Sequence, residues 1–184
     1  MARPEVLPPV ALRAKARRAY EAGRLRRGLV RALPIPLAAW LAMRLGSTPE
    51  HVLAVALPLA VAVVLLHWRG GPAGRAVVPG LSVGTAPLLL PGLAMDCAEA
   101  CSASCALWCR VSCVGGGLLA GALVGLYASR LGSDRIPFAL SAAVVATATG
   151  AMGCLVGGAV GVAGMLAGFA LAAVPVMVLV PRRA

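Results

Sequence analysis

Charged residues are scarce in this chain, and acidic residues are the scarcest of them. Only 12% of its 184 residues are charged, with six Asp and Glu against seventeen Lys and Arg. Soluble domains carry about 25% charged residues, whereas this chain is 60% hydrophobic. It therefore has too little charge to cover a surface in water, and the composition predicts an all-α, polytopic membrane helical bundle.

Motifs for catalysis and for nucleic-acid recognition are also missing. The chain has two histidines, no pair of histidines at metal-binding spacing, no phosphate-binding loop and no nucleophile elbow. Aromatic residues make up 4%, and no aromatic or glycine-rich readout motif accompanies the basic residues. We therefore expect neither an enzyme nor a protein that binds nucleic acid directly.

Long apolar runs are what the chain does have. Residues 136–180 contain no acidic or basic side chain, and one helix of that length would measure about 67 Å, twice a hydrocarbon core of about 30 Å. The run must fold back, and Gly157-Gly158 is the predicted turn. Pro79, Pro87 and Pro91 predict a kinked or irregular third span. Six transmembrane spans are predicted, at 30–45, 50–67, 76–95, within 105–129, 136–156 and 159–180.

The basic residues predict the orientation of these spans. If the N-terminus is cytoplasmic, 15 of the 17 Lys and Arg lie on the cytoplasmic side, and Arg44 and Arg110 lie outside. The expected location is thus the cytoplasmic (inner) membrane of a bacterium, with both termini cytoplasmic. Residues 1–31 form a basic cytoplasmic tail, which we do not interpret as a cleaved signal, and residues 32–184 form the six-span bundle.

The tail can form a helix with five arginines near one face. This face is expected either to lie on anionic lipid or to bind a cytosolic partner protein. The five arginines are Arg13, Arg17, Arg24, Arg27 and Arg31.

Five cysteines recur at every fourth position before and within the fourth span. On a helix they form one slanted row, and the same step continues to Gly117, Gly121 and Gly125, which is a pattern of small residues typical of close helix packing in membranes. The row consists of Cys97, Cys101, Cys105, Cys109 and Cys113. In the fifth span, Ser141, Thr147 and Thr149 are expected to form hydrogen bonds between helices.

Three interpretations of the cysteines remain open. They can be small packing residues. They can bind a soft metal ion such as Zn, Cu or Hg. They can also be redox-active, in which case bridges to another helix are favoured, because cysteines four apart on one helix pair poorly. Cys154, near the external end of the fifth span, is the partner available within the chain.

The arrangement resembles that of the NrsF-like integral-membrane anti-sigma factors. The resemblance rests on the basic tail before a span containing Trp40, the cysteine before the fourth span, the loop SRLGSDR (129–135) and Cys154 at the end of the fifth span. It implies a tail that binds an extracytoplasmic-function sigma factor through residues 1–31. It also implies external cysteines that sense metal or oxidative stress, with Cys154 and either Cys109 or Cys113 as the sensing pair.

Three functional hypotheses follow. The first is a membrane-integral regulator of the anti-sigma type, which acts in transcription regulation under stress. The second is a soft-metal uptake or resistance protein that uses the cysteine row. The third is a membrane scaffold in which the cysteines only pack.

Overall fold

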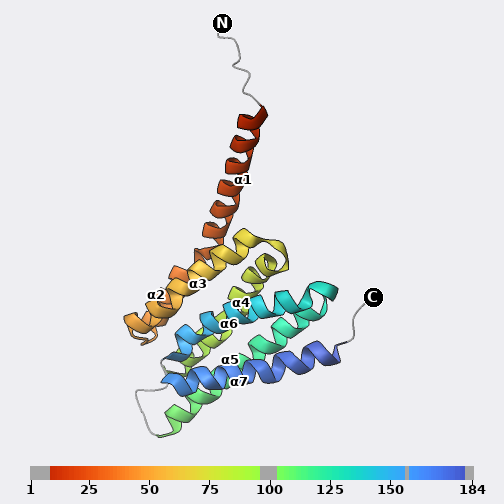
Figure 1. Cartoon of the computed structure of the whole chain (residues 1–184). Coiled ribbons are helices and arrows are strands. Elements are labelled where there is room, and N and C mark those ends of the chain that lie inside the picture. Colours follow the sequence, from red (N-terminus) through yellow and green to blue (C-terminus); the bar gives the residue numbers. More distant parts are fainter. Residues whose placement is uncertain (1–8, 96–102, 156–157, 181–184) are drawn as a thin grey trace.

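The computed structural model describes residues 9–95, 103–155 and 158–180, and the described part contains helices but no strands (Figure 1). A 3₁₀ turn, η2 (Gly132–Asp134), precedes α6. The helices are α1 (Pro9–Ala32), α2 (Pro34–Arg44), α3 (Pro49–Arg69), α4 (Gly71–Met95), α5 (Ala103–Ser129), α6 (Arg135–Cys154) and α7 (Gly158–Leu179).

Five helices, α3 to α7, contain segments long and apolar enough to cross a membrane. The chain is therefore a multi-pass membrane protein built as a helical bundle. These helices agree closely with the second to sixth predicted spans. Gly158 begins α7 with a φ of 68°, a left-handed conformation that suits glycine at the predicted turn.

The first predicted span is divided between two helices. α1 ends at Ala32 and α2 starts at Pro34, because proline cannot donate the backbone hydrogen bond that would continue a helix. The 11 residues of α2 measure about 17 Å, short of a membrane core of about 30 Å. However, the end of α1 also packs on α3, since Gly28 lies against Val64. Residues 28–44 therefore run beside α3 for about 25 Å.

The four helices α4 to α7 form two close parallel pairs. In the first pair, Gly80 and Gly84 of α4 lie against Ala142 and Ala146 of α6. In the second pair, Gly117 and Gly121 of α5 lie against Met165 and Phe169 of α7. The pair α4/α6 is the more central, because half of each spanning window is buried, compared with 44% for α5 and 22% for α3 and α7. In Figure 1, α2 and α3 flank one side of α4/α6, and α5 and α7 lie on the other.

Prolines do not interrupt α4. The sequence predicted a kinked or irregular span, and the helix runs without a break from Gly71 to Met95 through Pro79, Pro87 and Pro91. Prolines are tolerated in membrane helices when neighbouring groups pair with the backbone carbonyls that they leave free. The contact of α4 with α6 provides such a group, the thiol of Cys154.

The bundle has two chemically different ends. The basic end contains the end of α3, the beginnings of α4 and α6 and the end of α5, and it carries Arg69, Arg75, Arg130 and Arg135. The cysteine end contains the turn between α2 and α3, the first turns of α5 and the end of α6. α1 extends away from the bundle beyond the basic end (Figure 1).

Candidate functional site: a buried thiol cluster

Three of the predicted cysteines meet at the cysteine end of the bundle. Cys109 and Cys113 lie one turn apart on α5, and Cys154 is the last residue of α6. Their exposed fractions are 8%, 0% and 0%. Cys113 and Cys154 belong to one packed cluster, and Cys109 lies one turn before Cys113 in the same row of α5. Two helices that are separate in sequence thus bring these three sulfur atoms into one buried group, which we call the thiol cluster.

The thiol cluster also contacts the two remaining helices of the core. Met165 of α7 packs on Cys113 and Cys154. A Cβ atom at Gly161 of α7 would lie 3.5 Å from the sulfur of Cys113. The thiol of Cys154 donates a hydrogen bond to the backbone carbonyl of Pro87 in α4, with a sulfur–oxygen distance of 3.7 Å. All four helices α4 to α7 therefore meet at the cluster.

The carbonyl of Pro87 has a specific need for this donor. In an α-helix it would accept a hydrogen bond from the backbone N–H four residues later, but that residue is Pro91, which has no N–H. A buried carbonyl without a partner is costly, above all in a membrane. The Cys154 thiol is thus a replacement donor, and the sequence signal for it was the i, i+4 spacing of two prolines.

The cysteine row continues into the contact between α5 and α7. A Cβ atom at Gly117 or Gly121 would overlap the backbone carbonyl oxygen of Met165 or Phe169, respectively. At Gly125 it would lie 2.9 Å from the side chain of Val176. These three glycines lie where the two backbones approach each other, and the thiol cluster lies at one end of the same contact.

The other predicted metal ligands lie largely outside the described residues. Cys97 and Cys101 fall within 96–102, and Cys105 is described only as a backbone position in α5. Among the side chains that the structure describes, no group of three or more His, Cys, Asp or Glu is placed to hold a metal ion. The five-cysteine metal site therefore stays a prediction.

Hydroxyl groups make different contacts from those expected. Thr147 and Thr149 donate to the carbonyls of Ala143 and Val145 on their own helix, at 2.7 and 2.8 Å, and do not bridge helices as predicted. In the described part of the chain, the hydroxyl of Ser47, between α2 and α3, links two elements by donating to the carbonyl of Met152 in α6 at 3.0 Å. Ser47 was not among the residues that the sequence predicted to form hydrogen bonds between helices.

The five predicted arginines of α1 divide into an outer and an inner group. Arg13 and Arg17 are exposed on the projecting part, where Arg17 pairs with Glu21 at 2.9 Å. The inner group approaches the end of α3. There Arg24 lies against Gly70, and Arg31 donates to Nδ1 of His67 at 3.2 Å. Arg27 lies between Arg24 and Arg31 in the sequence, and its side chain is exposed.

No protein-family model, curated protein or solved structure matches this chain, so comparison with known proteins assigns it to no family. The features of this chain that bear on function are therefore the thiol cluster and the arrangement of charge.

Proposed function

We propose that this chain is a membrane-integral regulator of the anti-sigma type. In this proposal, thiols at the external end of the bundle sense an oxidant or a soft metal ion, and α1 binds an extracytoplasmic-function sigma factor in the cytoplasm. The observation that carries the proposal is that Cys113 and Cys154, from two different helices, pack together with Cys109 one turn away. They lie at the end of the bundle opposite the basic helix α1.

The proposed topology has six crossings in a bacterial inner membrane, with both termini inside. The end of α1 and α2 together serve as the first crossing, because residues 28–44 follow α3 for most of its length. The positive-inside rule then assigns the basic end to the cytoplasm. This assignment leaves the thiol cluster near the external surface, where thiols oxidise more readily than in the cytoplasm.

A chemical change at the cluster would alter the contact between α4 and α6. Formation of a Cys113–Cys154 disulfide releases both thiol protons and passes two electrons to the oxidant. Binding of a soft metal by the thiolates also releases protons. In either case Cys154 no longer donates to Pro87, and that carbonyl loses its replacement partner.

The change can reach α1 through packed helices. α4 follows directly from α3, whose end contacts Arg24 and Arg31 of α1. A switch of this kind requires two packings that differ in their affinity for the signal. In the reduced packing described here, α1 presents its outer arginines to solvent, as docking to a soluble protein requires.

The test of the proposal is purification of the full-length chain from its host under reducing conditions, with identification of bound proteins by mass spectrometry. We expect a sigma factor to co-purify. The double substitution Arg13→Glu/Arg17→Glu should abolish its binding, because it reverses charge on the outer part of α1 without touching the contact with α3. The matched control is Arg75→Glu/Arg130→Glu at the basic end of the bundle. Absence of a sigma factor, or equal recovery with all three chains, contradicts the proposal.

The same preparation tests the sensing step. We expect a thiol oxidant, or Zn²⁺, Cu⁺ or Hg²⁺, to release the sigma factor from the native chain but not from Cys113→Ser or Cys154→Ser. Release from these variants as well would show that the thiol cluster is not the sensor. Accumulation of the metal in cells, lost on substitution of the cysteines, would instead support metal uptake.

A second candidate function is a scaffold with cysteines that only pack. One observation favours it: Cys109 and Cys113 belong to the same helix row as the glycines that contact α7. This candidate predicts that replacing all six cysteines by serine preserves folding and every phenotype of the host.

A further inference from the structure

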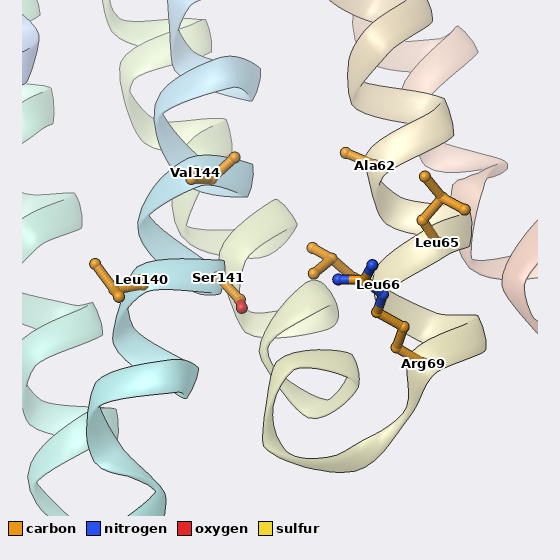
Figure 2. Close-up of a pocket in the computed structure, with 7 residues that line it drawn as sticks. All are labelled: Ala62, Leu65, Leu66, Arg69, Leu140, Ser141 and Val144. Carbon is orange, nitrogen blue, oxygen red and sulfur yellow. The ribbon is translucent and has the colours of Figure 1, made fainter.

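A groove opens between α3 and α6 near the basic end of the bundle. Its volume is about 370 Å³, and its walls are mainly apolar, with Leu65 and Leu66 on α3 and Leu140 and Val144 on α6. This volume is within the range of about 300–1,000 Å³ that is common for small-molecule sites. Figure 2 shows the two helices facing each other across this gap.

The groove opens to the side of the bundle. Its wall residues Leu65, Leu140 and Val144 have exposed fractions of 48%, 64% and 57%, although both helices qualify as membrane spans. Apolar side chains that are exposed at the level of a span face the hydrocarbon of the bilayer. An occupant of the groove would therefore enter from the lipid.

A single cation reaches into this apolar groove. In Figure 2 the side chain of Arg69 folds back so that its guanidinium lies beside Leu66, in the gap between α3 and α6, with the Ser141 hydroxyl on the opposite side. Within the described part of the chain the one ion pair is Arg17–Glu21, so Arg69 has no carboxylate partner there. Guanidinium groups bind phosphate oxygens with two parallel hydrogen bonds.

We propose that the groove binds one anionic phospholipid. One acyl chain packs between α3 and α6, and the headgroup phosphate pairs with Arg69 at the membrane surface. An extended protein segment fits less well, because the apolar part of the groove faces hydrocarbon, in which its backbone groups would be left unpaired. The lipid would connect the end of α3, which contacts α1, to the first turns of α6.

The experiment measures phosphatidylglycerol binding to the purified full-length chain by native mass spectrometry, with phosphatidylcholine as the comparison lipid. We expect Arg69→Ala to weaken phosphatidylglycerol binding about fivefold, which corresponds to about 1 kcal/mol for one basic residue at an anionic surface. The matched control is Arg130→Ala, which removes the same charge at the same end of the bundle but outside the groove. Equal losses in the two variants would mean unspecific attraction and would overturn the proposal.

A second pair of variants tests the acyl-chain part of the groove. Ala62→Phe fills the groove two turns from Arg69, whereas Val61→Phe adds the same ring on the exposed neighbouring position, outside the lining. Binding should fall only with Ala62→Phe, and circular dichroism should give the native helix content for both. Unchanged binding with Ala62→Phe contradicts the proposal. Competition by inorganic phosphate as effective as that by the lipid would also contradict it, because the site would then bind phosphate alone.

Discussion

At the scale of single residues, the contact between Cys154 and Pro87 explains why a cysteine at this position does more than fill space. Alanine would pack as well, but it has no proton to donate to the carbonyl that Pro91 leaves without a helical partner. The same contact connects the chemistry of the thiol to the backbone of the central helix. A packing role and a sensing role for Cys154 are therefore compatible.

Two substitutions of Cys154 test this contact. Cys154→Ala should lower the free energy of unfolding by about 1 kcal/mol, because a buried carbonyl loses its donor. Cys154→Ser should lower it less, since its hydroxyl can still donate. Thermal unfolding of the reduced protein in detergent provides the measurement. Equal midpoints for the alanine and serine variants would contradict the role assigned to the Pro87 carbonyl.

At the scale of elements, small residues determine which helices become neighbours. α5 and α7 are not consecutive in sequence, yet their backbones touch at Gly117 and Gly121, where a side chain would overlap a carbonyl oxygen. Close approach of this kind increases van der Waals contact, which drives helix association in lipid. The thiol cluster depends on it, because Met165 and Gly161 of α7 cover Cys113.

The close approach predicts opposite effects for two glycines on α5. Gly121→Ala should destabilise the protein by about 1–3 kcal/mol, because the backbone of α7 must move to admit the methyl group. Gly115→Ala is the matched control, since nothing lies within 4 Å of its Cβ position. There the substitution should be neutral or stabilise the helix by about 0.5–1 kcal/mol. Unfolding in detergent measures both, and a smaller loss at Gly121 than at Gly115 would refute the interface.

At the scale of the whole molecule, the two ends of the bundle differ in the number of basic residues that they carry. The basic end carries Arg69, Arg75, Arg130 and Arg135, whereas Arg44 and Arg110 lie at the cysteine end. The helix directions that produce this separation come from the packing of α4 on α6 and of α5 on α7. They are independent of the count of basic residues from which the orientation was predicted.

Labelling from one side of the membrane tests the proposed orientation. In a chain whose native cysteines are replaced by serine, His51→Cys marks the cysteine end and Ser133→Cys marks the basic end, and both positions are exposed. A membrane-impermeant maleimide should label His51→Cys in intact spheroplasts and Ser133→Cys only after lysis. The reverse pattern would place the thiol cluster in the cytoplasm and would remove the sensing proposal.

The sequence alone was enough to predict a helical membrane bundle and the limits of most of its long helices. Apolar runs bounded by charged residues, prolines and glycines determine helix ends locally, as in α3 and in the turn before α7. The prediction of the first span was less accurate. Pro34 divides this span into two helices, but the apolar residues continue across the break between two flanking arginines, so the pattern of hydrophobicity alone does not indicate it. Six crossings and the cytoplasmic side of the basic end stay predictions.

Only the tertiary structure determined which residues share a site. The i+4 row of cysteines could be read from the sequence, but the selection of Cys154, Pro87 and Met165 as neighbours of Cys113 depends on helices paired in parallel over long sequence separations. The groove beside Arg69 arises in the same way, from α3 and α6, which are separated in the chain by α4 and α5. The ends of helices follow from local backbone chemistry. Which helices become neighbours depends on how well their surfaces fit together in three dimensions, and this fit cannot be read from one sequence.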